Sequence, residues 1–349
     1  MIKIKIQDRL IGENEPVFVI AEAGVNHNGD INLARNLIDV AKDVGADAVK
    51  FQTFKPDNMI LKTAPKAKYQ MKTTPALESQ YEMLKRLELS FDDFKMLKKY
   101  ADEKSIIFLS SPFDQESVDL LVELGVCAIK IPSGEITNLP LLKYIGERKL
   151  PVILSTGMST IGEIEEAVET IESTGNNEII LLHCVSNYPT APEDVNLQAI
   201  KLLRKIFQLP VGYSDHTEGI EIPLASISLG ARVIEKHFTL NKSLPGPDHK
   251  ASLNPEEIKA MIKGIRIIEK AIRSRRKKPG DIEIKVRSAV RKSIVCNVEK
   301  IPKGTIITNE MLGIKRPGIG LTPKFIDLIV GRVAKEEIIK DELISWDKI

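Results

Sequence analysis

The chain has 349 residues, a formal net charge of +2, 43% hydrophobic residues and 28% charged residues. This length is enough for a barrel and an additional module, and this composition supports a large core rather than disorder. The near-neutral charge and the 5% aromatic content argue against a general basic or base-stacking surface, so we expect neither a nucleic acid nor a membrane as partner.

The cysteines and the N-terminus indicate the compartment. Cys127, Cys184 and Cys296 are widely spaced and form no CxxC pair, so they predict neither a disulfide framework nor a zinc site. The first residues alternate apolar and charged side chains, which is typical of a short strand. They contain no apolar signal region, and no later run is apolar enough for a membrane span. We therefore expect a cytoplasmic protein.

From about Val17 the chain repeats one unit, a short apolar run followed by an amphipathic helical stretch. The apolar runs are VFVIAEAG, ADAVKFQTF, SIIFLSSPF, CAIKIPSGE, PVILSTGM, IILLHCVS, PVGYSDHT and ARVIEKHF. Helices are expected over residues 31–44, 91–104, 115–124, 161–174, 197–207 and 255–273. Eight such units predict a closed (β/α)8 TIM barrel. An open doubly wound sheet is the alternative, because spacing alone does not prove closure.

Two segments depart from this repeat. Residues 55–78 are polar with little periodicity, which suits a loop over the mouth of the barrel. SRRKKPGD, at residues 274–281, is a charged segment with Pro and Gly, which we interpret as a solvated linker rather than a nucleic-acid patch. We expect a barrel domain over residues 1–275, a linker over 276–287 and a small, mainly-β domain over 288–349.

Nearly every apolar run ends in polar side chains, although interior strand positions should be apolar. These residues are Glu22, Lys50, Gln52, Ser110, Ser111, Lys130, Ser133, Ser155, Ser186, Ser214, His216, Lys236 and His237. Barrel active sites lie at the carboxyl ends of the strands, so the pattern predicts one shared site.

The first strand runs into AEAGVNHNGD, a polar turn before a helix that Asp30 caps. Glu22 on this apolar strand must be paired or functional, because a lone buried carboxylate is costly. A structural ion pair with a barrel lysine is the alternative to a catalytic role. His27 either binds a metal or bonds to local backbone.

Lys50 and Lys130 each lie within an apolar run, and two lysines in one barrel repel each other unless an anion lies between them. Ser133, Ser155 and Ser214 add hydroxyl donors, and the adjoining turns add backbone N–H groups. Together they predict a site for a small ligand with two anionic ends, such as phosphoenolpyruvate. A Schiff-base aldolase with a lysine nucleophile is the alternative.

His216 and His237 end the seventh and eighth runs, which are neighbours in a barrel. Two imidazoles with open positions suit a divalent ion such as Mn²⁺, Zn²⁺ or Co²⁺. Asp215 and Glu235 flank them, and we expect these carboxylates to orient the rings. Two packed core histidines are the alternative.

Three further segments bear on the site. LPGPDHKAS follows the eighth run, and its rigid loop places Asp248 over the mouth, either to bind sugar hydroxyls or to cap a turn. In SNYP, Tyr188 is expected to reach the substrate, whereas His183 and Cys184 are expected to be packed. The chain contains no GxxxxGK[ST], GxSxG or HExxH, and GIG near Gly318 is not a dinucleotide fingerprint.

AEAGVNHNG, KFQTF, IKIPSGE, ILSTGM, LLHCVSNYPT, GYSDHT, EKHFT and PGPDH occur in one order. The chain thereby resembles the sialic acid synthase family, which comprises N-acetylneuraminate synthase and its legionaminate and pseudaminate relatives. The tail resembles the antifreeze-like SAF domain through IPKGTIIT and IKRPGIG. The resemblance extends from about Glu15 to the end.

The resemblance implies a TIM barrel followed by a SAF domain, in a domain-swapped homodimer whose SAF domain reaches over the partner's barrel. It assigns phosphoenolpyruvate to Lys50, Lys130, Ser133, Ser155 and Ser214. His216 and His237 would hold Mn²⁺, with Mg²⁺ or Co²⁺ as alternatives. The residues implied to contact the amino sugar are Glu22, Gln52, Tyr188, Asp248 and Arg316. Further substrate contacts are expected at Ser111, Phe113, Glu135 and Ser186, where some family members have Asn in place of Ser186.

The expected catalytic residues are Glu22, Lys50, Lys130, His216 and His237. The expected reaction joins phosphoenolpyruvate, N-acetylmannosamine and water into an N-acetylneuraminate-type acid and phosphate, with C–O cleavage. A legionaminate or pseudaminate synthase using a 2,4-diacetamido-trideoxyhexose is the alternative. More distant alternatives are a KDO-8-phosphate-type synthase, a Schiff-base sialate lyase, and a carbohydrate- or ice-binding module suggested by the tail alone.

Overall fold

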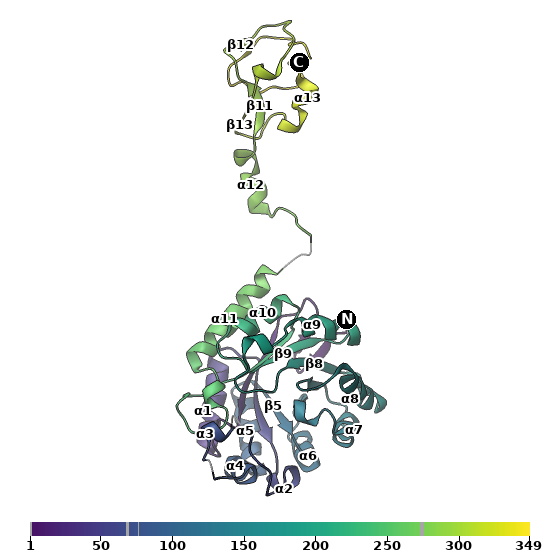
Figure 1. Cartoon of the computed structure of the whole chain (residues 1–349), viewed down its shortest axis with the longest axis vertical. Helices are drawn as coiled ribbons and strands as arrows, with labels where there is room; N and C mark the ends of the chain where they lie inside the picture. The colour runs from purple at the N-terminus through teal and green to yellow at the C-terminus, as the bar shows by residue number, and fades with distance from the viewer. Residues whose placement is uncertain (1, 68–69, 76, 273–275) are drawn as a thin grey trace. The chain divides into compact units, whose positions relative to one another are not determined.

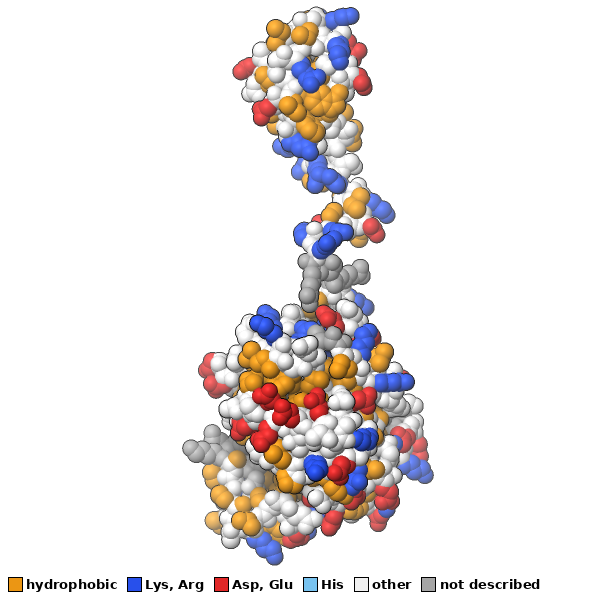
Figure 2. Space-filling model, turned by 90° about the vertical axis from the view of Figure 1, so that its right-hand side faces the viewer, with side chains coloured by type: hydrophobic (Ala, Val, Ile, Leu, Met, Phe, Trp, Pro, Cys, Tyr) orange, Lys and Arg blue, Asp and Glu red, His pale blue; other side chains and the backbone are white. Residues whose placement is uncertain are grey.

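The computed structural model describes residues 2–67, 70–75, 77–272 and 276–349. The chain forms two compact units, Met1–Arg273 and Ser274–Ile349. None of the helices in these ranges combines the length and the apolar composition needed to span a bilayer. On the face shown in Figure 2, acidic and basic side chains are interspersed over the larger unit, in keeping with the near-neutral net charge.

The first unit is built on eight parallel strands, each formed by one of the predicted apolar runs. They are β3 (Phe18–Gly24), β4 (Ala48–Thr53), β5 (Ile107–Pro112), β6 (Ile129–Ile131), β7 (Val152–Ser155), β8 (Ile179–Cys184), β9 (Val211–Asp215) and β10 (Val233–His237). Hydrogen bonding gives the order β5-β4-β3-β10-β9-β8-β7-β6, and β5 and β6 pack against each other. The sheet therefore curves round into a TIM barrel (Figure 1), which confirms the predicted fold over the open-sheet alternative.

Helices surround this sheet and bury one apolar stripe each. They are α1 (Ile31–Asp43), α5 (Phe91–Glu103), α6 (Gln115–Glu123), α7 (Leu139–Glu147), α8 (Ile161–Ser173), α9 (Gln198–Phe207), α10 (Glu221–Ser228) and α11 (Pro255–Ala271). In α1 the Asp30 carboxylate accepts the N–H of Asn32 at 2.7 Å, which confirms the predicted cap, and Leu37 and Ile38 are buried. The predicted end of the last helix, residue 273, lies outside the described residues.

Alternation along each strand divides the apolar residues into two layers. One side chain set packs between the sheet and the helices, for example Val19 and Val49. The other fills the barrel interior, for example Phe18 and Ile20. A predicted N-terminal strand is present as half of an antiparallel hairpin, β1 (Ile4–Ile6) and β2 (Arg9–Ile11), whose isoleucines pack with this interior set. Apolar residues therefore fill the amino end of the barrel.

The polar segment after β4 forms short helices rather than the irregular loop that we expected. Within residues 55–78 they are α2 (Pro56–Met59) and α3 (Gln70–Thr73), and α4 (Gln80–Leu87) follows the segment. Pro56 begins α2, and a capping box between Ser79 and Glu82 begins α4, so local capping outweighs the weak periodicity. The Thr73 hydroxyl lies 3.5 Å from the carbonyl oxygen of Pro247, so the segment covers the barrel mouth as predicted.

The second unit is small and mainly β, as predicted. β11 (Ser293–Cys296) pairs with β13 (Leu312–Lys315), and β12 (Lys300–Ile301) pairs with β14 (Ile338–Ile339), both antiparallel. A short helix, α13 (Ile326–Ile329), packs on the apolar core of this unit. The linker expected over residues 276–287 contains the first part of α12 (Asp281–Val290), because the Glu283 carboxylate accepts the N–H of Gly280 at 3.0 Å and caps that helix.

Candidate active site

A cavity of about 480 Å³ opens at the carboxyl ends of the barrel strands. Fourteen of the predicted site residues line it: Glu22, Lys50, Gln52, Ser111, Phe113, Lys130, Ser133, Ser155, Ser186, Tyr188, Ser214, His216, His237 and Asp248. The strand register causes this convergence, since Glu22 lies beside Lys50 and Gln52 lies beside Ser111 in adjacent strands. Side chains that point inward near the carboxyl end of each strand are polar, so they form a polar layer above the apolar interior of the barrel.

Two lysines and two carboxylates form the floor of the cavity. The Lys50 ammonium lies 2.8 Å from Glu22 Oε2 and 3.7 Å from Glu235 Oε2. The Lys130 ammonium lies 3.3 Å from Glu235 Oε1. All four side chains are buried, so Glu235 is the counter-charge that allows the two lysines to share one site in the absence of a ligand.

The two carboxyl groups have pKa values on opposite sides of their ordinary value. Burial raises the pKa of Glu22 to about 7, although Lys50 partly opposes the shift. Burial would also raise the pKa of Glu235, but Lys130 and Lys50 outweigh it and hold that pKa at about 2. Glu235 is therefore ionised at neutral pH, whereas Glu22 can both hold and release a proton.

The lysines differ in a similar way. Burial disfavours the charged form of both, yet Glu22 and Glu235 outweigh burial at Lys50 and raise its pKa. At Lys130 burial prevails over Glu235, and Lys50 adds repulsion, so its pKa is lowered. Lys130 thus depends more strongly on a nearby anion for its charge.

Hydroxyl and amide groups lie beside these charged side chains. Ser214 donates to Glu235 at 2.8 Å, Lys50 donates to Ser111 at 3.1 Å, and the N–H of Gly157 donates to Ser133 at 2.9 Å. The Ser155 hydroxyl is buried without a hydrogen-bond partner among the described residues. Such a group in a cavity is available to a ligand.

The backbone approaches the serines closely at Gly157. A Cβ atom at this position would lie 2.5 Å from Ser186 Oγ and 2.8 Å from Ser133 Oγ. Only glycine leaves both hydroxyls where they are.

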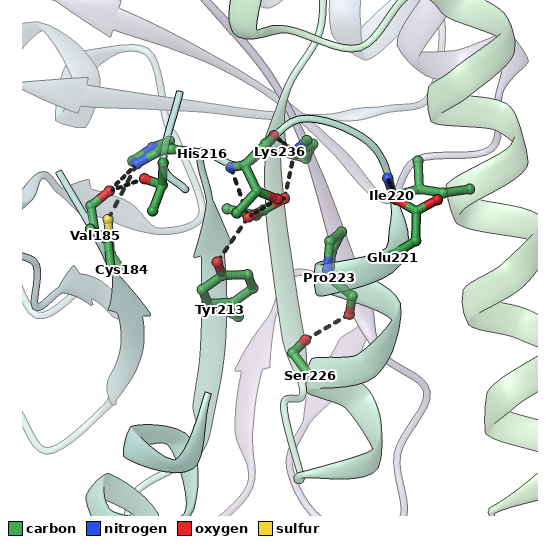
Figure 3. Close-up of polar contacts among 12 residues, drawn as sticks. Cys184, Val185, Tyr213, His216, Ile220, Glu221, Pro223, Ser226 and Lys236 are labelled. Carbon is green, nitrogen blue, oxygen red and sulfur yellow. Dashed lines mark hydrogen bonds and ion pairs between the residues drawn. The ribbon is translucent and has the colours of Figure 1, made fainter. Parts of the chain in front are cut away.

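His216 and His237 face each other across the neighbouring strand ends, with ring centroids 5.5 Å apart. Nδ1 of His216 lies 2.7 Å from the carbonyl oxygen of Val185 (Figure 3), which leaves Nε2 for a ligand. Nδ1 of His237 is buried without a partner among the described residues. Tyr188 packs over both rings, at centroid distances of 3.9 Å and 5.7 Å.

These two imidazoles fit a divalent ion, because one ion with bonds of about 2 Å to each ring can span their separation. Within the described ranges, no group of three or more His, Cys, Asp or Glu side chains could hold a metal. The remaining ligands would therefore be water or substrate oxygen, which is the arrangement of a catalytic rather than a structural site.

Neither flanking acid contacts an imidazole directly, contrary to the prediction that these carboxylates orient the rings by bonding to them. Asp215 points out of the barrel and bonds to Tyr213, Thr217 and Lys236 rather than to an imidazole. Glu235 points inward to the lysines. Because side chains alternate along β9 and β10, a residue next to an inward histidine faces outward, and a residue two positions away faces inward.

Alternation also corrects other strand-end assignments. Ser110 faces outward and bonds to Thr53 at 2.7 Å, whereas Lys236 is buried behind the sheet. His183 is packed as predicted, with its ring stacked on Tyr213. Cys184 is buried but lines the cavity, with Sγ 3.8 Å from Nδ1 of His216. Glu235 and Cys184 are thus the cavity residues that the sequence reasoning placed elsewhere.

The loops above the cavity are tied together by buried polar groups. Asn26 donates to the Phe238 carbonyl at 2.8 Å and to Ser252 at 2.9 Å, and Ser252 donates to the Asp248 carbonyl at 2.7 Å. Asp248 is itself buried, and burial raises its pKa to about 6. It lines the cavity, in line with the predicted site role rather than that of a helix cap.

His27, Glu135 and Arg316 complete the predictions. Nδ1 of His27 accepts the N–H of Gly29 at 3.0 Å, which is the local backbone bond that we weighed against metal binding. Glu135 is half-buried, accepts from Asn138 at 2.7 Å and is not among the residues that line the cavity. Arg316 belongs to the second unit, where it is exposed.

Comparison with known proteins agrees with this geometry. Residues 37–277 match the NeuB family and residues 295–349 match the SAF domain. An N,N'-diacetyllegionaminic acid synthase from Campylobacter jejuni is 51% identical over 93% of this chain and 98% of its own length. The protein of the same name from Legionella pneumophila is 48% identical over 97% of this chain and 96% of its own length. A similar solved structure is the N-acetylneuraminic acid (sialic acid) synthetase of Leptospira borgpetersenii in complex with citrate. It superposes with a TM-score of 0.73 and is 37% identical, over 83% of this chain and 97% of that chain.

The fold and the cavity define a TIM-barrel enzyme with two buried lysines in its cavity. The chain belongs to the NeuB family and ends in a SAF domain. The predicted resemblance to sialic acid synthases is confirmed, and with it, at the level of the family, the prediction of a phosphoenolpyruvate-dependent transferase.

Proposed function

We propose that this enzyme condenses phosphoenolpyruvate with the open-chain form of an N-acetylated amino sugar and with water, releasing phosphate and a nonulosonic acid. The observation that carries the proposal is the convergence of Lys50, Lys130 and two imidazoles on one cavity. Phosphoenolpyruvate has two anionic ends, and the lysines with Ser133, Ser155 and the Gly157 turn offer it cationic and hydroxyl partners.

The residues also suggest how the reaction proceeds. Lys50 and Lys130 would hold phosphoenolpyruvate so that its C3 faces the aldehyde carbon of the sugar, which removes association entropy from the barrier. Bond formation between these carbons leaves positive charge at C2, where water adds. Glu22, whose pKa is about 7, would take the proton of that water and return it to the sugar oxygen. The adduct then loses phosphate by C–O cleavage, and the lysines stabilise the departing charge.

A divalent ion on His216 and His237 is part of the proposal, and Mn²⁺ is the ion that we expect. Such an ion supplies a Lewis acid for the sugar carbonyl. The charge balance supports it. Glu235 offsets one of the two lysines. The substrate brings a carboxylate and a phosphate that carries about −1.5 to −2 on its own. Removing metal with a chelator should abolish turnover, and Mn²⁺, Mg²⁺ or Co²⁺ should be compared in restoring it. Full activity of a His237→Ala variant would refute the metal site.

The sugar is proposed to be a 2,4-diacetamido-trideoxyhexose, with N-acetylmannosamine as the second candidate. Relatives named N,N'-diacetyllegionaminic acid synthase are 48% and 51% identical, against 37% for the N-acetylneuraminic acid synthetase. Among the described residues that line the cavity, Lys50 and Lys130 are the only Lys or Arg side chains. Within the barrel of one chain a sugar phosphate would therefore lack a cation of its own, which favours an unphosphorylated sugar over a KDO-8-phosphate-type substrate.

A substrate panel tests the proposal. Phosphate release from phosphoenolpyruvate should be fastest with the diacetamido sugar, slower with N-acetylmannosamine and slowest with its phosphate ester. Heavy oxygen placed in the bridging position of phosphoenolpyruvate should appear in the released phosphate, because the C–O bond breaks. Label retained in the sugar product would refute the mechanism, and trapping of the enzyme by borohydride with pyruvate would favour the Schiff-base alternative.

Assembly and location are also proposed. We infer a homodimer in which Arg316 of one chain contacts the sugar bound in the partner's barrel, since Arg316 is exposed in its own unit. Heterodimers of an Arg316→Ala chain and a Lys130→Ala chain should then regain part of the activity that both homodimers lack. The three free thiols support a cytoplasmic location, which cell fractionation can test.

A further inference from the structure

A fully buried ion pair lies directly behind the two imidazoles. The Lys236 ammonium is 2.5 Å from Asp215 Oδ2, and both side chains are 0% exposed. Asp215 immediately precedes His216, and Lys236 immediately precedes His237. The two residues are also cross-strand neighbours in the β9–β10 ladder. The ion pair therefore joins the two strands at the level where they present the imidazoles.

The hydrogen bonds of this pair involve the residues directly before and after His216. Asp215 Oδ1 accepts the N–H of Thr217 at 3.0 Å and the hydroxyl of Tyr213 at 2.8 Å. The Lys236 ammonium also donates to the carbonyl oxygen of Thr217. Lys236 thus holds both the residue before His216 and the residue after it.

His216 is held from the other side as well. Its carbonyl oxygen accepts the N–H of Thr190 at 2.8 Å, and its Nδ1 lies against the Val185 carbonyl. His216 is thus held to the segment after β8, and Lys236 joins it to β10 in addition to the backbone ladder between β9 and β10. Apolar side chains usually hold neighbouring strands of a barrel together at such positions, since a buried ion pair adds little net stability over well-packed apolar residues.

We propose that Asp215 and Lys236 are positioning residues that set the separation of the His216 and His237 imidazoles, and thereby the affinity of the pair for a divalent metal ion. The inference rests on the proposed metal site. Binding sites demand placement within about 0.5 Å, and partners behind the ligands of a metal commonly change its affinity by about 10-fold to 100-fold.

The test is a double variant, Asp215→Asn/Lys236→Met, in the full chain. It removes both charges together, because removing one partner alone would leave a buried charge and endanger folding. The amide oxygen that replaces the Asp215 carboxylate can still accept the Thr217 N–H, so the turn after β9 is kept. A control away from the site is Asp47→Asn/Arg266→Met, which removes a partly buried pair 3.1 Å apart at the amino end of the barrel, where Arg9 and Glu269 are the further partners.

Mn²⁺ affinity of the metal-free proteins is measured from the electron paramagnetic resonance of free Mn²⁺, and imidazole coordination from nitrogen couplings in the pulsed spectrum. We expect the dissociation constant of the double variant to rise at least about tenfold, or about 1.4 kcal/mol. The nitrogen coupling of one imidazole should weaken. The control should bind Mn²⁺ like the wild type, even where its melting temperature falls equally.

The outcomes separate this inference from the proposed function. A wild-type chain that binds no Mn²⁺ and shows no nitrogen couplings would refute the metal site itself. A wild type that binds Mn²⁺ through both imidazoles, with a folded double variant of unchanged affinity and couplings, would refute only the positioning role. If the double variant does not fold, Asp215→Glu decides, because it keeps both charges and lengthens the carboxylate arm by one methylene group. A raised dissociation constant for Mn²⁺ is then expected, and an unchanged constant in the folded Glu variant refutes the inference.

Discussion

Replacing Glu235 with Gln removes the charge that two buried lysines share while it keeps the shape of the side chain. The amide oxygen can still accept from Ser214, which lies 2.8 Å from the native carboxylate. Lys50 retains Glu22 at 2.8 Å, whereas Lys130 loses the carboxylate at 3.3 Å. The variant therefore places a buried ammonium without a counter-charge in the floor of the cavity.

The magnitude follows from the pKa of Glu235, which the lysines hold at about 2 against an ordinary 4.5. A depressed carboxyl pKa stabilises the folded state above the ordinary value, and that stability is lost as the pH falls from 4.5 towards 2. At 1.36 kcal/mol per unit, this shift corresponds to about 3 kcal/mol at neutral pH. We expect the Gln variant to lose about that much free energy of unfolding at pH 7.

Urea unfolding of the ligand-free chain measures this loss. The single tryptophan, Trp346, lies in the second unit, so far-ultraviolet circular dichroism should follow the barrel. Glu123→Gln, which affects an exposed pair with Lys95 at 3.7 Å, is the control and should change stability by less than about 0.5 kcal/mol. The reasoning is refuted by a Glu235→Gln chain as stable as the wild type at pH 7, or by a difference that does not narrow below pH 4.5.

Three other predictions concern the same cavity. Because the pKa of Glu22 is raised to about 7, the free energy of unfolding should fall by about 3 kcal/mol as the pH rises from 4.5 to 7. Urea unfolding at a series of pH values measures this dependence, which a Glu22→Gln chain should lack. Gly157→Ala should displace the Ser133 hydroxyl and raise the KM for phosphoenolpyruvate by about 10-fold to 100-fold, with little change in the KM for the sugar. Equal changes in both KM values would contradict the proposed anion site. His249 Nε2 lies 3.1 Å from Asn28 Oδ1 and thereby holds the loop that carries Asp248. His249→Ala should therefore lower the free energy of unfolding by about 1–3 kcal/mol and raise the KM for the sugar. An unchanged sugar KM in steady-state kinetics would argue against sugar binding by that loop.

The sequence alone determined the elements of the barrel and half of the residues that line the cavity. Strand and helix periods are local properties, so eight apolar runs and their amphipathic partners could be recognised in order. Polar residues at the ends of those runs had to meet at one rim once the sheet was parallel and closed. Lys50, Lys130, His216 and His237 could therefore be assigned to one site before any coordinates.

The alternation of side chains along each strand also predicts which strand-end residues face the cavity. Glu235 lies two positions before His237, so it faces the same side of β10, and Asp215, one position before His216, faces away. The same counting along β8 places Cys184 inside the barrel and His183 outside it. These assignments needed only the parity of each strand.

Only the tertiary structure decided which groups pair. That Glu235 lies between two lysines, that burial outweighs Lys50 at Glu22, and that Lys236 bonds on both sides of His216 all depend on distances between strands far apart in sequence. The placement of the short helices over the mouth likewise depends on contacts with the loop after β10, although their caps are local. Periodicity is a property of neighbouring residues, whereas pairing, burial and pKa arise from closure of the whole barrel, which a local pattern does not specify.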